Sequence, residues 1–387
     1  SGPSPTNPSY QHPAHQLMDD PTITSTSGSK LRDRSIWFHL HFWIGWIAAI
    51  PIALVCLTGA ILIFEGELIR WENQEYFQLE ENGSPLTTQQ VLDTYRSSDP
   101  PLQVNHLGIP KASSHAYSAY VTEIQPDGSR RGGKVYLNQY TGELTWAGDK
   151  FTLSGLIIDV HRHLAAGKIG QQIIGVSSLV LAVTCIIGLV LWWPLRGRTF
   201  IRAWKRGQAL DWHNALGLVA MAPLIVMAIT GISFTWGKHM WPFLEGIQGR
   251  PSQTVMPAIT VAEGNEKISV DVIIDQIRAE FPGKRITGIQ PGSGKQTPVK
   301  AFLDADGNNL QLVMDPYTGE ELLRIDGTGN GPVGWYRKNF GKFHTFGPYH
   351  ITLRILWGLI SLGGTILAFT GLWISIKRWR RPKRRAT

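Results

Sequence analysis

The chain repeats itself, because two stretches of its first half return without a gap in its second half. Residues 41–64 align with residues 213–236, and residues 161–189 align with residues 344–372. The aligned positions carry identical residues: His41 with His213, Pro51 with Pro223, Thr58 with Thr230, His161 with His344, Ser178 with Ser361 and Gly188 with Gly371. An internal repeat of this length predicts two copies of one structural unit, so the fold is built on a duplicated core.

Four apolar runs, at about residues 35–64, 169–193, 213–236 and 351–376, predict transmembrane helices. Each is long enough to cross about 30 Å of hydrocarbon at about 1.5 Å per residue. Tryptophans, which favour the headgroup layer, stand near the ends of the runs, among them Trp37, Trp43, Trp192, Trp193, Trp212, Trp236, Trp357 and Trp373. The predicted fold class is a membrane protein with a four-transmembrane-helix bundle, built from two pseudo-symmetric repeats.

Basic residues near the ends of these runs predict the orientation in the membrane. Lysine and arginine are concentrated before the first run, between the second and third runs, and in the tail KRWRRPKRR after the fourth. Short flanks rich in Lys and Arg stay in the cytoplasm, so both termini are expected on that side of a bacterial inner membrane. The net charge of +8 then reflects topology and contact with anionic lipid, and nucleic acid is not an expected partner.

The domain plan follows from the spans and their orientation. Residues 1–34, which are rich in Pro, Ser and Thr, are predicted to be a disordered cytoplasmic N-terminus. Residues 194–212 form a basic cytoplasmic loop, and residues 377–387 form a basic cytoplasmic tail. Residues 65–168 and 237–350 are the two large periplasmic segments.

Each periplasmic segment is predicted to be a small α+β module. The runs LTTQQVLDTYRSS and ISVDVIIDQIRAEFP have apolar residues at helical spacing. Strands are predicted at AYSAYVTEI and KVYLNQYTGELTW in the first module, and at VKAFLDA and LQLVMDPYTGEELLRI in the second. Both modules contain Tyr-Thr-Gly-Glu, at residues 140–143 and 317–320, which we interpret as a turn.

His41, His213, His161 and His344 are the candidate site residues. A histidine at the end of a membrane helix is costly unless it has a partner, and the repeat presents these four as two pairs. Two neutral imidazoles without a carboxylate or thiolate suit the axial positions of a b-type haem. Zn²⁺ would need at least three protein ligands. Each pair therefore predicts one haem, with its iron bound between the two histidines.

The neighbouring histidines leave an alternative open. His39 lies two residues from His41, and His163 lies two residues from His161, so each is a less favoured substitute for its neighbour as ligand. The repeat gives neither His39 nor His163 a histidine counterpart, which favours the other pair. The two cysteines of the chain form no C-x-x-C-H motif and are too few for an iron–sulfur cluster.

The chain resembles the PepSY-associated transmembrane family, and within it the inner-membrane ferric-siderophore reductases of the ferrioxamine-reductase kind. The resemblance covers about residues 35–380. It is carried by H-x-x-x-G at His41 and His213, by Thr-Gly pairs at Thr58, Thr230 and Thr370, by H-x-x-L-x-x-G from His161 to Gly167, and by L-x-x-W-W-P at Leu189–Pro194. One departure is Ile187, where the other spans have Thr before Gly, and little effect is expected from it.

The resemblance implies a reductase with two b-type haems and two PepSY-like periplasmic domains. Electrons from a cytoplasmic or membrane donor would reach a ferric hydroxamate-type siderophore in the periplasm and release its iron as Fe(II). The protein would place and tune its cofactors, so no catalytic acid, base or nucleophile is expected. Residues near the outer mouth are candidates for contact with the siderophore: Trp335, Tyr336, Arg337, Tyr349 and His350.

Two other functions remain open. The chain could be a haem-binding accessory or regulatory membrane protein, whose PepSY-like domains bind a peptide or a protein partner. It could also carry electrons to another periplasmic acceptor. The sequence contains no Gly-rich dinucleotide fingerprint, so NAD(P)H or flavin input would have to come from a partner.

Overall fold

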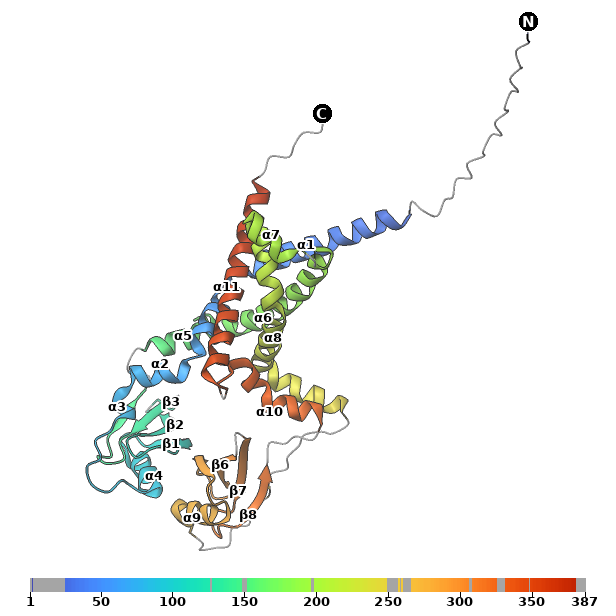
Figure 1. Ribbon diagram of the computed structural model, residues 1–387. Helices are drawn as coiled ribbons and strands as arrows, with labels where there is room; N and C mark the ends of the chain where they lie inside the picture. Colours follow the sequence, from blue (N-terminus) through green and yellow to red (C-terminus); the bar gives the residue numbers. More distant parts are fainter. Residues whose placement is uncertain are drawn as a thin grey trace.

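The computed structural model describes residues 2, 25–125, 127–147, 152–195, 198–248, 257, 259, 266–305, 308–325, 331–347 and 349–380. Over these residues, a bundle of long helices carries a β-sheet at one of its ends (Figure 1). The short helix α7 (Thr199–Arg206) lies at the other end, where α1 begins and α11 ends. We call these two ends of the bundle the sheet end and the α7 end.

Four helices are long and apolar enough to cross a membrane, so the protein is membrane-embedded, and the four predicted runs are confirmed. They are α1 (Ser25–Leu62), α6 (Gly167–Trp192), α8 (Ala209–Ile247) and α11 (Ile351–Trp379). In the bundle, α1 packs against α6 and α11, and α8 packs against the same two helices. Small residues permit this packing: a Cβ at Gly364 would lie 2.8 Å from Sγ of Cys56.

Two boundaries differ from the prediction. Helix α1 begins at Ser25, so the expectation that residues up to 34 lack structure is wrong from Ser25 onward. No proline separates this polar stretch from the apolar run, so the helix continues through it. Helix α8 runs on to Ile247, because aromatic residues beyond its apolar run pack against another helix, α10 (Pro332–Thr345). The predicted disorder of residues 3–24, and the tail beyond Arg380, lie outside the described residues.

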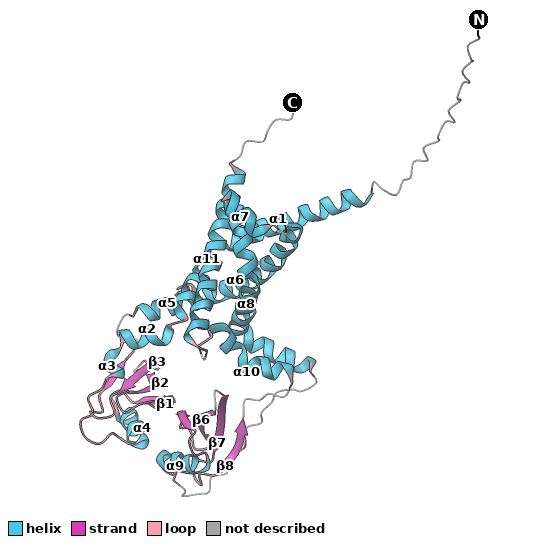
Figure 2. Ribbon diagram, viewed as in Figure 1, coloured by secondary structure: helices cyan, strands magenta, loops and turns pink. Residues whose placement is uncertain are grey.

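The strands form one antiparallel sheet of eight, in the order β4-β3-β2-β1-β5-β6-β7-β8 (Figure 2). They are β1 (Leu102–Gly108), β2 (Tyr117–Ile124), β3 (Arg130–Leu137), β4 (Leu144–Trp146), β5 (Arg285–Gln290), β6 (Val299–Ala305), β7 (Asn308–Met314) and β8 (Glu321–Ile325). The prediction of two separate modules is therefore corrected. Strands β1 and β5, which were not predicted, pair through Leu107 with Ile289 and through Gly108 with Gly288.

One face of the sheet is covered by α4 (Thr88–Ser97) and α9 (Val270–Glu280), the two helices predicted from apolar spacing. Their buried residues, among them Leu92, Tyr95 and Ile273, form a single hydrophobic core with both halves of the sheet. The Tyr-Thr-Gly-Glu sequences make the turns between β3 and β4 and between β7 and β8, with Gly142 at φ 75° and Gly319 at φ 77°.

Short helices connect the sheet to the bundle. They are α2 (Glu65–Glu72), α3 (Gln74–Phe77) and α5 (Leu153–His163) in the first half, and α10 in the second. At the α7 end, the segment predicted as a basic loop, residues 194–212, contains α7, which a 3₁₀ turn, η1 (Trp193–Leu195), precedes. The chain thus enters the bundle at the sheet end through α5 and α10, and both helices carry a candidate histidine.

Arg354 ties this connecting layer to the bundle. Its guanidinium donates from Nη1 to Oε1 of Glu67 at 2.7 Å and from Nη2 to Oε2 at 2.9 Å. A third bond joins Nη2 to the carbonyl oxygen of Ile63 at 2.6 Å. The hydrogen bonds from Arg354 lower the pKa of Glu67 from its ordinary 4.5 to about 2. Bidentate pairing of this kind fixes geometry as well as charge.

Replacement of Glu67 by Gln should destabilise the protein by about 0.5–1 kcal/mol, because the pair is partly exposed. The lowered pKa means that the stabilisation is complete above about pH 4.5 and is lost as the pH falls toward 2. Thermal unfolding of detergent-purified wild type and variant between pH 7 and pH 3 measures the difference. Glu65→Gln, on the same helix and without an ion pair among the described residues, is the control. A pH-independent difference would contradict the assignment.

Candidate functional site

The bundle brings the four predicted histidines together as two pairs. His41 of α1 faces His213 of α8, with ring centroids 6.5 Å apart. His161 of α5 faces His344 of α10, with ring centroids 6.2 Å apart. The first pair lies toward the α7 end and the second toward the sheet end, because α5 and α10 are the connecting helices on that side.

These separations fit one metal ion between the two rings of each pair. A metal–imidazole bond of about 2.0 Å, with about 1.1 Å more from nitrogen to ring centre, places opposed centroids about 6.2 Å apart. The two observed separations, 6.5 and 6.2 Å, are close to this value.

The sheet-end pair is held by two threonines that the sequence repeat aligns. Nδ1 of His161 lies 3.0 Å from Oγ1 of Thr58, and Nδ1 of His344 lies 2.8 Å from Oγ1 of Thr230. Both hydroxyls donate their only proton to a carbonyl in their own helix, that of Leu54 or Val226, at 2.7 Å. Each threonine oxygen must then accept from the histidine, so Nδ1 carries the proton.

This tautomer leaves Nε2 of each ring with a free lone pair. No described residue makes a hydrogen bond to Nε2 of His161 or His344. A hydrogen-bonded Nδ1–H opposite a free Nε2 is the usual arrangement of a histidine that ligates a metal. Burial lowers the pKa of His161 to about 4 and that of His344 to about 3, so both rings stay neutral and able to coordinate.

In the pair toward the α7 end, only His213 has a hydrogen-bond partner at Nδ1 among the described residues. Nδ1 of His213 lies 2.9 Å from Oγ1 of Thr370, whose proton goes to the carbonyl of Ile366 at 2.8 Å. Nδ1 of His41 is buried and has no hydrogen-bond partner in the described part of the chain. It faces the backbone of Thr184 without reaching hydrogen-bond geometry. The residue that the repeat aligns with Thr370 is Ile187, which has no hydroxyl to offer.

All four rings lie against a glycine, which explains why the repeat keeps glycine at these positions. A Cβ at each glycine would lie 3.1 to 3.7 Å from Cε1 of its histidine: Gly59 with His161, Gly231 with His344, Gly188 with His41 and Gly371 with His213. Helix backbone thus approaches each imidazole closely and fixes its plane. The sequence identified the glycines, but it did not identify these contacts.

The two alternative histidines lie elsewhere. Nδ1 of His163 is 3.0 Å from a carboxylate oxygen of Asp159 on the exposed side of α5. His39 lines a surface cavity between α1 and α11. Neither ring faces another histidine among the described residues.

The five residues predicted at the outer mouth do not form one group. Trp335, Tyr336 and Arg337 lie in the first turns of α10, whereas Tyr349 and His350 follow its last turn. Tyr336 bonds to Ser233 at 2.8 Å, and Arg337 pairs with a carboxylate of α8. Tyr349 packs on Phe346, directly beyond the turn that carries His344. Tyr349 and His350 therefore lie nearer to His344 along the chain than the first group does.

Each pair offers two imidazoles that could hold a metal or a cofactor. No cluster of three or more His, Cys, Asp or Glu side chains occurs in the part of the chain that the structure describes. A macrocycle that supplies four nitrogens of its own would need two imidazoles from the protein, which is the number that each pair contains.

Three residues of the site were missed as functional by sequence reasoning. Thr58, Thr230 and Thr370 were recognised in Thr-Gly pairs, without any role toward the histidines. The signal that could have found them is their fixed place beside glycine in three of the four spans. A threonine within a membrane helix usually bonds back to its own helix, so the second bond to histidine is visible only in the fold.

Fold and site together define a membrane-embedded protein with two half-buried histidine pairs in a helix bundle that carries an eight-stranded sheet. The chain belongs to the PepSY-associated TM region family, whose sequence model matches residues 38–378. No curated protein matches the chain. The resemblance stated from the sequence is thereby confirmed at the level of the family.

Replacement of Thr370 by Val should leave the buried Nδ1–H of His213 without an acceptor. An unsatisfied buried donor costs about 1–3 kcal/mol, so the melting temperature in detergent should fall accordingly. Thr184→Val is the matched control, because the Thr184 hydroxyl donates only to carbonyls of its own helix among the described residues. Equal losses in the two variants would contradict the hydrogen bond to His213.

Proposed function

We propose that the protein is a di-haem membrane reductase that passes electrons to a ferric siderophore and releases its iron as Fe(II). The observation that carries the proposal is the presence of two imidazole pairs, 6.5 and 6.2 Å apart, with three of the four Nδ1 atoms hydrogen-bonded to threonine. His41 and His213 would hold one b-type haem, and His161 and His344 would hold the other.

The proposal places the α7 end in the cytoplasm and the sheet in the periplasm of a bacterial inner membrane. Basic side chains at the α7 end support this orientation, because short cytoplasmic flanks are rich in Lys and Arg. They include Arg198, Arg202, Lys205, Arg206, Lys377, Arg378 and Arg380. The two halves of the bundle would then be related by pseudo-symmetry about an axis along the membrane normal, as the repeat predicts.

A haem bound at each pair would supply reversible one-electron transfer. The chain fixes the tautomer of three of the four imidazoles through threonine and packs helix backbone against each ring. The two pairs lie toward opposite ends of the bundle, so haems held there would stand at different depths in the membrane. The protein's part is thus placement and tuning rather than acid–base catalysis.

The proposed substrate is Fe(III) held by a hydroxamate-type siderophore. Hard oxygen donors bind Fe(III) far more tightly than Fe(II), so one electron is sufficient to release the metal from its carrier. Tyr349 and His350 are the best placed of the predicted mouth residues, because they follow the turn beyond His344. His350 is exposed, and its Nδ1 accepts from the backbone N–H of Thr352 at 3.3 Å.

A matched set of histidine variants tests the haem assignment. His41→Ala or His213→Ala should each remove one haem, and His161→Ala or His344→Ala should each remove the other. The haem-to-protein ratio of detergent-purified protein, with spectra before and after dithionite, provides the count. His163→Ala, whose ring bonds only to Asp159 among the described residues, is expected to retain two haems. A colourless wild type after haem supplementation would overturn the proposal.

The reaction of reduced protein with a ferric siderophore distinguishes a siderophore reductase from an electron carrier to another acceptor and from an accessory protein. Dithionite-reduced protein, freed of excess reductant, should be reoxidised by a ferric hydroxamate siderophore, with Fe(II) trapped by a chelator. Iron-free siderophore is the control. Haem that stays reduced would exclude the reductase. In that case a carrier for another acceptor, or an accessory protein whose PepSY-like domain binds a peptide, takes its place.

Ile187→Thr should complete the missing hydrogen bond at His41. A bond from Nδ1 increases the basicity of the ligating nitrogen, which favours the oxidised metal. We expect the reduction potential of one haem to fall and that of the other to stay unchanged in a redox titration. Ile186→Thr, one position away on an exposed part of the same helix, is the control. No shift at Ile187→Thr would mean that its hydroxyl does not reach His41.

A further inference from the structure

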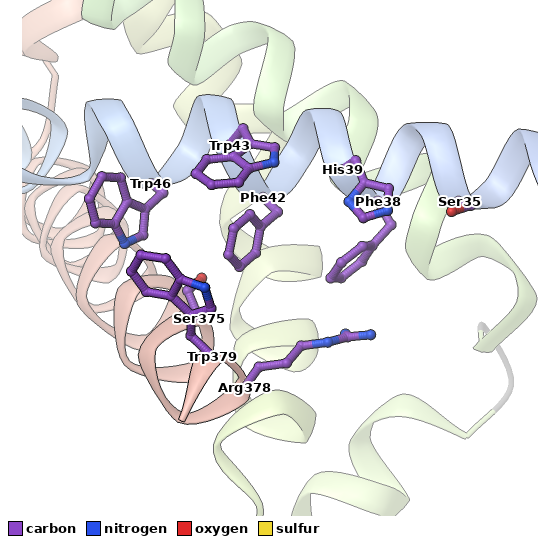
Figure 3. Close-up of a pocket in the computed structure, with 9 residues that line it drawn as sticks. All are labelled: Ser35, Phe38, His39, Phe42, Trp43, Trp46, Ser375, Arg378 and Trp379. Atoms are coloured by element: carbon purple, nitrogen blue, oxygen red, sulfur yellow. The ribbon is translucent and has the colours of Figure 1, made fainter. Parts of the chain in front are cut away.

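A cavity of about 500 Å³ opens between α1 and α11 at the α7 end of the bundle. Figure 3 shows Phe38 and Phe42 projecting from α1 into this space, with Arg378 of α11 on the opposite side. Five aromatic side chains form most of its walls: Phe38, Phe42, Trp43, Trp46 and Trp379. Four polar side chains complete the lining: Ser35, His39, Ser375 and Arg378.

Two of the polar side chains are free to bind a ligand. Arg378 makes no ion pair among the described residues, and its guanidinium stands 4.4 Å from the ring centroid of Phe38. His39 makes no hydrogen bond within the part of the chain that the structure describes, although its ring touches Phe38 edge-on, at 5.7 Å between centroids. The cavity thus combines flat apolar walls with one cation and one imidazole.

The second copy of the repeat does not reproduce this lining, so the scaffold does not require it. Where the first copy has an aromatic or imidazole side chain, the second copy has a different residue. Phe38 aligns with Leu210, His39 with Asp211, Phe42 with Asn214, Trp43 with Ala215 and Trp46 with Leu218. The histidines, glycines and threonines of the two pairs are repeated almost without exception. The α1 side of the lining is therefore specific to the first copy of the repeat.

The chain also closes the equivalent place in the second copy. Gly207, at φ 59°, turns the backbone so that α7 folds onto α8. Arg206 at the end of α7 then lies 4.0 Å from Asp211, the residue aligned with His39, which is buried. Ser35 is aligned with Gly207, and there α1 continues straight without a turn. The cavity between α1 and α11 therefore stays open.

The cavity adjoins the His41–His213 pair. The Ser375 hydroxyl on its wall donates to the carbonyl of Gly371 at 2.7 Å, and a Cβ at Gly371 would lie 3.5 Å from Cε1 of His213. On α1, Phe42 directly follows His41. The lining therefore begins one residue from His41 on α1, and about one helical turn from the glycine that contacts His213 on α11.

We propose that this cavity binds a lipid-soluble hydroquinone, which donates electrons at the His41–His213 pair. The inference rests on the proposed function, whose electron donor it identifies by chemical class. Aromatic rings stack on a flat quinone ring at centroid distances of about 4.5–7 Å. His39 accepts a hydrogen bond from one hydroxyl, and Arg378 donates to a ring oxygen. The exposed Trp46 and Trp379 border the opening toward lipid, where the apolar tail lies.

The stoichiometry balances with the proposed substrate. Oxidation of one hydroquinone to quinone releases two electrons and two protons. The two electrons reduce two Fe(III) of the siderophore substrate to Fe(II), one after the other, and the two protons pass to water at the α7 end. The step needs no dinucleotide or flavin on this chain, which agrees with the absence of a Gly-rich fingerprint from the sequence.

A phospholipid headgroup is the competing occupant, and the lining favours the hydroquinone over it. A phosphate is best held by several cations or backbone N–H groups, whereas Arg378 is the sole cation among the residues that line the cavity. Five aromatic rings offer a phosphate no donor apart from their indole N–H groups. They match a planar ring in shape and chemistry.

Binding is tested with the full chain in detergent and a photoreactive azido analogue of decylubiquinone. The label should map to peptides of α1 and α11 around residues 35–46 and 375–379, and decylubiquinone should compete for it. His39→Phe and Arg378→Gln should each weaken competition about tenfold or more, since about 1.4 kcal/mol of lost hydrogen bonding corresponds to a factor of ten. Arg380→Gln, exposed and outside the lining, is the matched control and should bind normally.

A kinetic arm uses the absorption change of the purified protein on mixing with decylubiquinol. The wild type and Arg380→Gln should be reduced at the same rate, and the two cavity variants about tenfold or more slowly. Dithionite should reduce all four proteins equally. Label outside the cavity, or variants that bind and react like the wild type, would overturn the inference. Phosphatidylglycerol that displaces the label while decylubiquinone does not would assign the cavity to lipid.

The two proposals fail in different ways. Protein that contains and reduces two haems but binds no quinone refutes the hydroquinone site and leaves the reductase standing. Protein without haem that still takes the label in the cavity refutes the reductase as proposed and keeps a quinone site whose role is then different.

Discussion

A threonine hydroxyl has a single proton, and in Thr58, Thr230 and Thr370 that proton is donated to a carbonyl one turn back in the same helix. The oxygen can then only accept, which obliges the facing histidine to carry its proton on Nδ1 and to keep Nε2 free. The arrangement also depends on the distances between the paired rings and on the glycines against which the rings lie. Loss of the acceptor would allow either ring nitrogen to carry the proton, so the position of the free lone pair would no longer be fixed.

The scaffold keeps each pair together although its members come from distant parts of the chain. His161 and His344 stand on α5 and α10, which connect the bundle to the sheet, and the sheet joins the two halves of the chain through Leu107 and Ile289. Arg354 adds a second connection between the same layers by holding Glu67 and the end of α1. The sheet-end site is therefore sensitive to the extramembrane domain, whereas His41 and His213 depend on helices of the bundle alone.

The sequence was sufficient to predict the elements that the repeat duplicates and those with strong apolar periodicity. The four spans, the helices α4 and α9, and the pairing of His41 with His213 and of His161 with His344 follow from alignment and apolar spacing. Strands β1 and β5 were missed because their pairing joins residues almost two hundred positions apart and leaves no local signal. The separation of Trp335 from Tyr349 was missed for a related reason: α10 lies between them, and the predicted plan contained no such helix. The unpaired Nδ1 of His41 could be anticipated from Ile187 only once the threonine contacts were known.

The order of the strands means that neither half of the chain can form the complete sheet alone. β1 and β5 lie at the centre of the sheet, with one half of the chain on each side. A half-length chain would expose one of these strands as a bare edge, which attracts further strands unless another copy covers it. It would also contain one imidazole of each pair and no opposite partner. Two such halves could complete each other only by associating, so the covalent link through α7 converts an obligatory dimerisation into a single folding event that no longer depends on concentration.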